Sequence, residues 1–466
     1  MRSTIARFFE PESIAVIASL KETWFGGYTL IKNLLVFGFP GKIYPVNPSY
    51  SKVLDMQVYP SIKEVPEAVD LAIIITPRHT VPGVIKQCAE NGVKAVIITS
   101  DGFAERDQEG SELQQEIVNI AKRSSIRILG PNTVGTANFA TGLVTTHFAT
   151  GYEKVRKGSV AFCAQSGIAG AQAFPLEDIQ YWISKICDFG NKCDVDETDI
   201  LEYLADDPDT KVIAMHIEDV KDGQRFVKIA TEVVRKKPVL MIKPGRTKEA
   251  KKALRAHTGA LAGEDQIYEA AFKQTGIIRV ENFEELLNFS KLFALQPLPR
   301  GNNIAIITTS GGGGILAIDT AIENGLAIAE LSDQSTGRLK ELSPTLGTNP
   351  IDIFTTSLVF EDMLRLYQEV MEIALSDHNV DCAAIVLYEA PFTVLQQHSQ
   401  IVEAFNSLKK FNKPVTIWLY GTRLSLMREL SLRLENSGFP VYSDFITPIK
   451  ALATAAKYSA CSPFPP

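Results

Sequence analysis

Short apolar runs alternate with amphipathic stretches along most of the chain. In the first part, apolar runs predict buried strands over residues 13–18, 42–48, 70–76, 93–99 and 126–129. Helical periodicity predicts helices between them, over residues 28–37, 61–67, 79–91 and 111–124. Alternation of this kind is typical of a doubly wound α/β domain with a parallel sheet.

The same alternation restarts twice. Strands are expected at 158–162, 182–188, 211–216, 238–243 and 277–280, with helices at 168–174, 197–205, 223–235, 264–276 and 282–294. A third run predicts strands at 303–308, 382–388 and 414–420, with helices at 315–324, 360–376, 395–411 and 423–437. We therefore expect an α/β fold of three Rossmann-like or flavodoxin-like parallel-sheet domains, at 1–137, 158–298 and 301–461, with a linker at 138–157.

Composition narrows the functional classes. The 466 residues are 45% hydrophobic and 22% charged, which suits a globular protein of about three domains. A net charge of −7 gives a nucleic-acid role no electrostatic support. The six cysteines form no CxxC pair and predict buried free thiols in a reducing compartment. No run reaches ~18 apolar residues, so we expect a cytoplasmic protein without a membrane span.

The first predicted domain has a candidate ligand edge. In a doubly wound sheet, ligands bind beyond the carboxyl ends of the strands. The residues expected there are Ser19, Gly27, Val46, Pro48, Thr76, Pro77, Thr99, Ser100 and Asn132. They predict a nucleotide-like ligand, although each glycine and proline could also serve only to make a turn. The first turn lacks a complete GxGxxG, so no dinucleotide site is predicted.

Two further turns could bind an anion. In the second domain, Gln165, Ser166 and Gly167 join a strand to a helix, where free backbone N–H groups and the helix dipole favour negative charge. An ordinary N-cap serine is the alternative. In the third domain, a glycine turn that includes Gly312, Gly313 and Gly314 allows backbone N–H groups to approach a phosphate. No Gly-Lys-Ser/Thr follows, so this turn is not a Walker A motif. The Asp-rich turn at 194–196 does not have calcium-loop spacing, and no metal site is expected.

One histidine has unusual surroundings. His257 lies between a Lys-rich segment and the small residues of 258–263, which offer little apolar area to bury. This composition predicts an exposed imidazole on a mobile loop, able to attack phosphorus or transfer protons. The alternative is a histidine that only caps or solvates the loop. Glu218, at the end of a predicted strand, could orient the imidazole, or could be a surface acid. Ser166, Glu218 and His257 all follow strands of one predicted sheet.

Long motifs connect these turns to a known family. They are Gly41–Pro48, Gly130–Asn132, Gln165–Gly167, Gly190–Asp196, Gly245–Thr247, His257–Gly263 and Leu295–Pro299. On these motifs, over nearly the whole chain, the sequence resembles the α subunit of ADP-forming acyl-CoA (acetyl-CoA) synthetases, which are related to succinyl-CoA synthetase.

The resemblance implies a reaction and residue roles. Acyl-CoA, phosphate and ADP would interconvert with a carboxylic acid, CoA and ATP through an acyl phosphate and a phosphohistidine at His257. It implies that Glu218 steadies this histidine. The helices that begin at Ser166 and at Gly312–Gly314 would hold the phosphate, and CoA or acyl-CoA would lie on the first domain.

The resemblance also implies a partner. The sequence contains no ATP-grasp pattern, so ADP or ATP and Mg²⁺ are expected on a separate ATP-grasp β subunit of a hetero-oligomer, in an α2β2 arrangement. Where the family has Gly-Ala-Ser in the first turn, this chain has Ile17–Ala18–Ser19, which leaves open a non-catalytic CoA-binding regulatory protein. The acid also stays open, with branched, aryl or dicarboxylic acids as alternatives to acetate.

Overall fold

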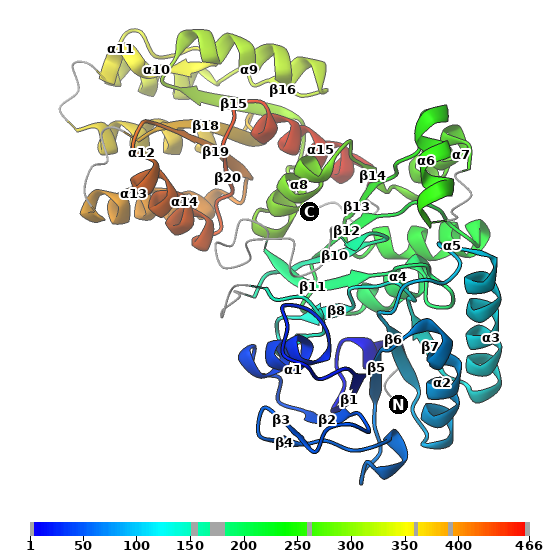
Figure 1. Ribbon diagram of the computed structural model, residues 1–466. Coiled ribbons are helices and arrows are strands. Elements are labelled where there is room, and N and C mark those ends of the chain that lie inside the picture. Colours follow the sequence, from blue (N-terminus) through cyan, green and yellow to red (C-terminus); the bar gives the residue numbers. More distant parts are fainter. Residues whose placement is uncertain are drawn as a thin grey trace. The chain divides into compact units, whose positions relative to one another are not determined.

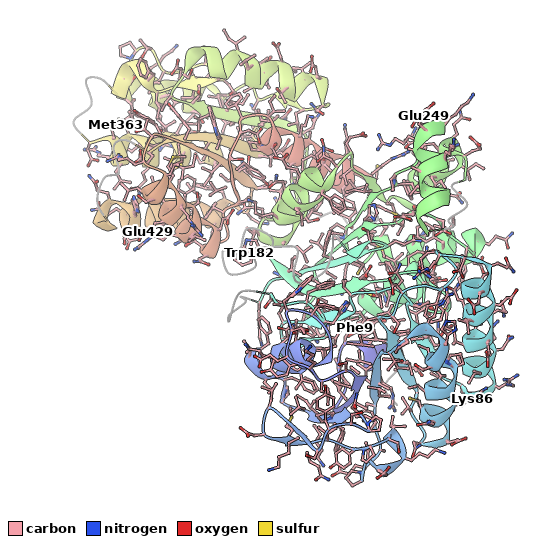
Figure 2. All side chains as sticks on the ribbon, viewed as in Figure 1. Phe9, Lys86, Trp182, Glu249, Met363 and Glu429 are labelled. Atoms are coloured by element: carbon pink, nitrogen blue, oxygen red, sulfur yellow. The ribbon has the colours of Figure 1, made fainter. Side chains whose placement is uncertain are left out.

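The computed structural model describes residues 4–150, 157–167, 182–258, 263–357, 362–389 and 395–461. The chain divides into two compact units, Met1–Asn282 and Phe283–Pro466. Figure 2 shows the side chains of both units: Lys86 and Glu249 lie at the rim of the first unit and Phe9 in its interior. No helix among the described residues combines the length and apolar content that crossing a membrane requires.

The first sheet has five parallel strands in the order β2-β1-β5-β6-β7. The strands are β1 (Ser13–Ala18), β2 (Lys42–Val46), β5 (Leu71–Ile75), β6 (Ala95–Ile98) and β7 (Arg127–Leu129). The helices are α1 (Gly27–Val36), α2 (Val81–Glu90) and α3 (Gln108–Ser124). Every residue of β1, β6 and most of β5 is buried, as expected for a sheet covered on both faces. The predicted helix 61–67 is only a short 3₁₀ helix, η2 (Ile62–Glu64).

The second sheet has the order β14-β13-β12-β10-β11-β8-β9. Its parallel part comprises β10 (Val160–Ala164), β11 (Ile183–Asp188), β12 (Val212–His216), β13 (Val239–Ile242) and β14 (Ile278–Arg279). Two antiparallel strands, β8 (Thr136–Asn138) and β9 (Leu143–Val144), extend it. Part of the segment that the sequence suggested as a linker is therefore sheet.

The second sheet is tied to the N-terminus by side-chain hydrogen bonds. The hydroxyl of Thr136 donates to the carbonyl of Phe8 at 2.7 Å, and the amide of Asn138 donates to the carbonyl of Phe9 at 3.0 Å. Phe9 also stacks on Tyr203, with ring centroids 4.9 Å apart. The two sheets thus form one compact unit.

Among the described residues, four helices accompany the second sheet, and the predicted helix at 168–174 lies outside them. They are α4 (Glu197–Ala205), α5 (Gly223–Val234), α6 (Lys248–Thr258) and α7 (Asp265–Thr275). α4 begins with a capping box between Asp196 and Asp199, so capping accounts for this acidic turn. The prediction that His257 lies on a loop is wrong for its backbone, because α6 includes this residue in its last turn. The Ala, Lys and Leu content of the segment favours helix over the flexible loop suggested by its flanking glycines.

The second unit contains the third sheet, with the order β16-β15-β18-β19-β20 and β17 also paired with β15. Its strands are β15 (Asn303–Thr308), β16 (Ala327–Ile328), β17 (Ile351–Asp352), β18 (Cys382–Tyr388), β19 (Val415–Tyr420) and β20 (Val441–Tyr442). Its helices include α8 (Phe283–Leu295), α9 (Gly311–Glu323), α10 (Asp333–Leu342), α12 (Met363–Ser376), α13 (Leu395–Leu408), α14 (Leu424–Asn436) and α15 (Thr447–Cys461). The α/β fold with parallel sheets predicted from the sequence is confirmed.

This unit differs from the predictions in several elements, and α10, β16, β17 and β20 have no predicted counterpart. The glycine run is not a turn before a helix: α9 already begins at Gly311, because the hydroxyl of Ser310 caps its first turn. The closing helix α15 was not predicted. It packs against α8, where Phe293 and Tyr458 meet edge to face with centroids 5.6 Å apart.

Candidate functional site

A cavity of about 510 Å³ lies in the first unit, where the carboxyl ends of strands from its two sheets come together. The first sheet contributes Ile75, Thr99, Ser100, Asp101, Asn132, Thr133 and Val134 to its lining. The second sheet contributes Gln165, Ser166, Gly167, Asp188, Gly190 and Asn191. The cavity thus brings three of the predicted CoA residues to the predicted anion turn of the second sheet.

The anion turn follows β10 and is held by Gln165. The backbone N–H of Gln165 donates to the carbonyl of His216 at 3.0 Å. Its side-chain oxygen accepts the N–H of Glu218 at 3.0 Å, and its amide nitrogen donates to Asp219 at 3.0 Å. Because its amide is used in this way, Gln165 positions the turn. Ser166 is half-buried and Gly167 is exposed, so these two are the residues of the turn that can meet a ligand.

Glu218 and Asp219 follow β12, beside this turn. Glu218 is buried, and its placement at the end of a strand agrees with the prediction. Asp219 accepts from the ammonium of Lys192 at 2.8 Å. Burial disfavours the charge of Asp219, but Lys192 and Gln165 outweigh it and lower the pKa of this carboxyl. Lys192 also pairs with buried Glu197 at 2.8 Å, so its charge is balanced within the protein.

Asp188 is a site residue that the sequence analysis did not select. It ends β11, lines the cavity and is 1% exposed. Its carboxylate accepts the N–H of Val134 at 2.7 Å and, more distantly, that of Gly190 at 3.4 Å. Burial, with a smaller contribution from Glu218, raises the pKa of Asp188 to about 6. The available signal was its position as the last residue of an apolar strand on the ligand edge.

Aromatic side chains form another wall of the cavity, lined by Trp24, Phe25, His147 and Phe148. The ring of Phe148 lies 5.7 Å from that of Trp24 and 4.3 Å from that of His147. Burial lowers the pKa of His147 to about 4, so its imidazole is neutral at pH 7. The sequence analysis missed this wall because 147–148 fell in the expected linker. Trp24 and Phe25 remain 67% and 48% exposed.

The other predicted CoA residues lie along the same edge of the first sheet, outside the cavity lining. Gly27 begins α1, and a Cβ there would lie 2.4 Å from the Cβ of Ala18, so glycine allows the helix to approach β1. Val46 is buried at the end of β2. The backbone of Thr76 is held by the hydroxyl of Ser100 through two hydrogen bonds. Ser19, Pro48 and Pro77 are exposed at this edge.

Two other predictions concern elements away from this cavity. The side chain of His257 lies outside the described residues, so its distance from Glu218 stays a prediction. In the second unit, the N–H of Gly313 donates to the hydroxyl of Ser310 at 3.2 Å and that of Gly314 to the carbonyl of Ser310 at 2.8 Å. The N–H groups at the open end of α9 are therefore those of Gly311 and Gly312.

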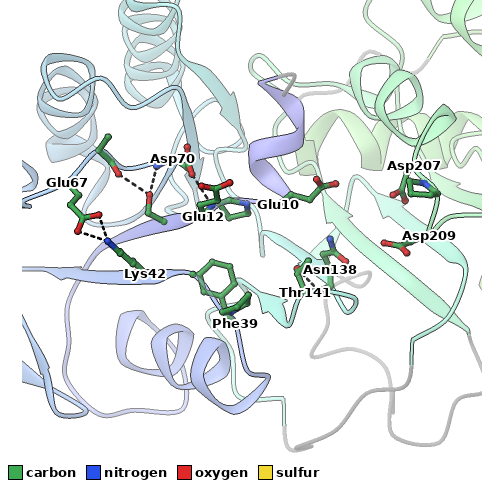
Figure 3. Close-up of a pocket in the computed structure, with 16 residues that line it drawn as sticks. Glu10, Glu12, Phe39, Lys42, Glu67, Asp70, Asn138, Thr141, Asp207 and Asp209 are labelled. Carbon is green, nitrogen blue, oxygen red and sulfur yellow. Dashed lines mark hydrogen bonds and ion pairs between the residues drawn. The ribbon is translucent and has the colours of Figure 1, made fainter. Parts of the chain in front are cut away.

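A larger cavity, of about 890 Å³, lies at the opposite, amino end of β1 (Figure 3). Its lining is acidic, with Glu10, Glu12, Glu67, Asp70, Asp207 and Asp209. Several of these carboxylates are already paired, as Glu67 is with Lys42 and Asp207 with Lys185. An acidic lining does not suit phosphate or CoA, and none of the predicted site residues belongs to it. Among the described residues, no group of three or more acidic, His or Cys side chains is arranged to hold a metal.

Two family models match segments of this chain. Residues 12–138 match a CoA binding domain, and residues 157–293 match a succinyl-CoA ligase-like flavodoxin domain. The cavity is lined from both matched segments. The matches therefore agree with the CoA-binding and ligase character that the motifs suggested.

Comparison with curated proteins gives relatives over nearly the whole chain. The alpha subunit of the ADP-forming acetate–CoA ligase II of Pyrococcus furiosus is 37% identical over 443 residues, which cover 93% of each chain. The ADP-forming acetate–CoA ligase II of Archaeoglobus fulgidus is 34% identical over 97% of this chain, and the match spans 66% of that longer protein. The chain thus spans about two thirds of the length of this relative.

A solved structure shows the same fold. The dinucleotide-forming acetyl-coenzyme A synthetase 1 of Ca. Korarchaeum cryptofilum, determined with phosphate and ADP, is 30% identical, with a TM-score of 0.88 over 98% of this chain and 97% of that one. The resemblance drawn from the motifs is confirmed: the chain belongs to the family of ADP-forming acetate–CoA ligases and is related to their alpha subunits.

Proposed function

We propose that the chain is the α subunit of an ADP-forming acyl-CoA synthetase, which interconverts acyl-CoA, phosphate and ADP with a carboxylic acid, CoA and ATP. The observation that carries this proposal is the shared cavity. Its lining includes Thr99, Ser100 and Asn132, which we assign to CoA, together with Ser166 and Gly167, which we assign to phosphate. A thioester and a phosphate could therefore meet in one place.

In the first step, phosphate bound at the Ser166–Gly167 turn attacks the thioester carbonyl. A carbon–oxygen bond forms and the carbon–sulfur bond breaks, which gives an acyl phosphate, and the proton of hydrogen phosphate passes to the CoA thiolate. Backbone N–H groups at the turn hold the phosphate charge without reorganisation.

In the second step, the imidazole of His257 attacks the phosphorus, the bond between phosphorus and the acyl oxygen breaks, and the carboxylate leaves. The buried carboxylate of Glu218 stabilises the cationic imidazole of the phosphohistidine. The first turn of α9 is proposed as a second phosphate-binding helix end, where the N–H groups of Gly311 and Gly312 are open and those of Gly313 and Gly314 are bonded to Ser310. His257 then transfers the phosphoryl group to ADP, which requires movement of its segment.

The nucleotide and Mg²⁺ are assigned to a separate ATP-grasp β subunit, in an α2β2 assembly in the cytoplasm. The relatives that are named as alpha subunits support such a partner. When bound there, Mg²⁺ would neutralise charge on the transferring phosphates. We keep the three-domain division and the small carboxylic acid substrate as parts of this proposal.

The test is labelling of the protein by phosphate. The purified chain is mixed with acetyl-CoA and radiolabelled phosphate, without nucleotide, with His257→Ala as the parallel sample. An acid-labile, base-stable label on the wild type and none on the variant is the expected result. If no label forms with a panel of acyl-CoAs even when the partner is added, the chain binds CoA without catalysis and the proposal is wrong.

A further inference from the structure

The charges that line the 510 Å³ cavity are unbalanced. Among the described lining residues there is no lysine or arginine, and His147 is neutral at pH 7 because burial lowers its pKa to about 4. Two carboxyl groups are present: Asp101 is exposed, whereas Asp188 is buried. Any acyl group in the cavity therefore meets one buried carboxylate and no side-chain cation.

The carboxylate of Asp188 has room for another hydrogen-bond donor. The N–H of Val134 donates to one oxygen at 2.7 Å, the N–H of Gly190 lies 3.4 Å from the other, and the hydroxyl of Thr133 also bonds to this carboxyl. An ionised carboxylate offers about four acceptor positions. The cavity volume also exceeds what an acetyl group needs, so it has space for a longer chain along the aromatic wall of Trp24, Phe25 and Phe148.

We propose that Asp188 determines which acyl group is used: it accepts a hydrogen bond from a hydroxyl group on the acyl chain and repels a second carboxylate. This inference rests on the proposed function, because it assumes that the acyl group occupies the cavity beside Ser166. Rejection follows from like charges in a partly desolvated site, because the described lining residues offer a second carboxylate no side-chain cation. The predicted substrates are neutral or hydroxylated monocarboxylic acids of moderate length.

The test uses three four-carbon thioesters that differ only at the chain end: butyryl-CoA, 4-hydroxybutyryl-CoA and succinyl-CoA. Phosphate-dependent labelling of the full chain is measured for the wild type and for Asp188→Asn, which removes the charge and nearly keeps the shape. We expect the wild type to use the hydroxylated thioester at least as well as butyryl-CoA and to disfavour succinyl-CoA. Asp188→Asn should raise the succinyl-to-butyryl ratio by about tenfold or more.

Two further variants separate charge from folding effects. Asp188→Ser provides a second neutral side chain if the asparagine variant folds poorly. Glu116→Gln, which removes an exposed carboxyl outside the cavity, should keep the wild-type ratio. Equal use of succinyl-CoA and butyryl-CoA by the wild type, or an unchanged ratio in both Asp188 variants, would overturn the inference.

Failure of the proposed selectivity can be distinguished from failure of the proposed catalysis. Calorimetric binding of the same three thioesters reports the discrimination without turnover. If binding discriminates between them through Asp188 but no label forms on any, the selectivity stands and the proposed catalysis fails. If label forms equally from all three, the catalysis stands and the selectivity fails.

Discussion

The side-chain oxygen of Gln165 accepts the backbone N–H of Glu218 at 3.0 Å, while its amide nitrogen donates to the carboxylate of Asp219 at 3.0 Å. One side chain therefore connects the turn after β10 to the turn after β12. The first turn carries the proposed phosphate site and the second the proposed histidine partner, so their spacing depends on this amide.

The first prediction concerns the side-chain amide of Gln165, whose oxygen and nitrogen have different partners. Gln165→Glu keeps an acceptor for the N–H of Glu218 but places an oxygen against Asp219, so we expect a loss of about 1–3 kcal/mol in the free energy of unfolding at pH 7. The loss should diminish as the pH falls and the new carboxyl becomes protonated. Chemical unfolding at pH 5 and pH 7 measures it. An equal loss at both pH values would show that charge repulsion is not the cause.

The second prediction concerns the buried cation of Lys192, which pairs with Glu197 and Asp219 at 2.8 Å each. Lys192→Met leaves buried Glu197 and partly buried Asp219 without their cation and should cost about 3–5 kcal/mol of unfolding free energy. Denaturant titration measures this loss. Lys236→Met, which removes the exposed pair with Asp206, is the control and should leave the unfolding midpoint nearly unchanged.

The third prediction follows from the raised pKa of Asp188, about 6 against 3.8 for an unperturbed aspartate. The folded protein holds this proton more tightly than the unfolded chain, so the stabilisation is complete below pH 3.8 and is lost as the pH rises through about 6. Asp188→Asn should therefore be more stable than the wild type at pH 8, by on the order of 2 kcal/mol. The difference should shrink towards pH 4, and scanning calorimetry across this range measures it. A constant difference would contradict the assignment.

The fourth prediction has the opposite sign, because burial lowers the pKa of His147 to about 4 from an unperturbed 6.5. The unfolded chain binds this proton more readily, so the stabilisation is complete above pH 6.5 and declines as the pH falls through about 4. His147→Phe keeps a ring against Phe148 and cannot take up a proton. It should lose less stability than the wild type between pH 7 and pH 5. Parallel melting curves of both proteins at these pH values provide the comparison.

The fifth prediction addresses Glu218 directly. Glu218→Gln keeps the side-chain shape but removes the charge proposed to stabilise the phosphohistidine, so label formation should fall by about a hundredfold. Glu202→Gln, an exposed position on α4, should label as the wild type does. Equal labelling of both variants would assign Glu218 a purely structural role.

Many strands of the fold could be predicted from the pattern of hydrophobic residues. The predicted strands at 13–18 and 382–388 coincide with β1 and β18, because both are continuous apolar runs buried in parallel sheets. The turns predicted to bind CoA and an anion were inferred from this strand pattern, because the carboxyl ends of parallel strands meet at one edge of a sheet. Asn132 and Ser166, far apart in the sequence, accordingly line one cavity.

The predictions from the sequence are wrong where tertiary contacts or helix capping determine the local structure. Four consecutive glycines predict a turn by propensity, yet Ser310 caps them into the first turn of α9. The aromatic wall escaped detection because Phe148 reaches the first sheet through a bridge to Phe25, which no local pattern encodes. Asp188 was overlooked because its signal, the last position of an apolar strand on the ligand edge, is shared by the end residues of the other strands.

The pairing of β8 with β11 has a consequence for how such chains can recombine. Thr136 and Asn138 belong to the second sheet, yet their side chains hold the carbonyls of Phe8 and Phe9. A chimera that exchanged residues 1–138 for those of a relative would carry β8 with it and disrupt the pairing of β8 with β9 and β11 in the second sheet. The CoA-binding segment therefore cannot be exchanged by itself. A crossover near Asn282, between the compact units, would leave both sheets of the first unit intact.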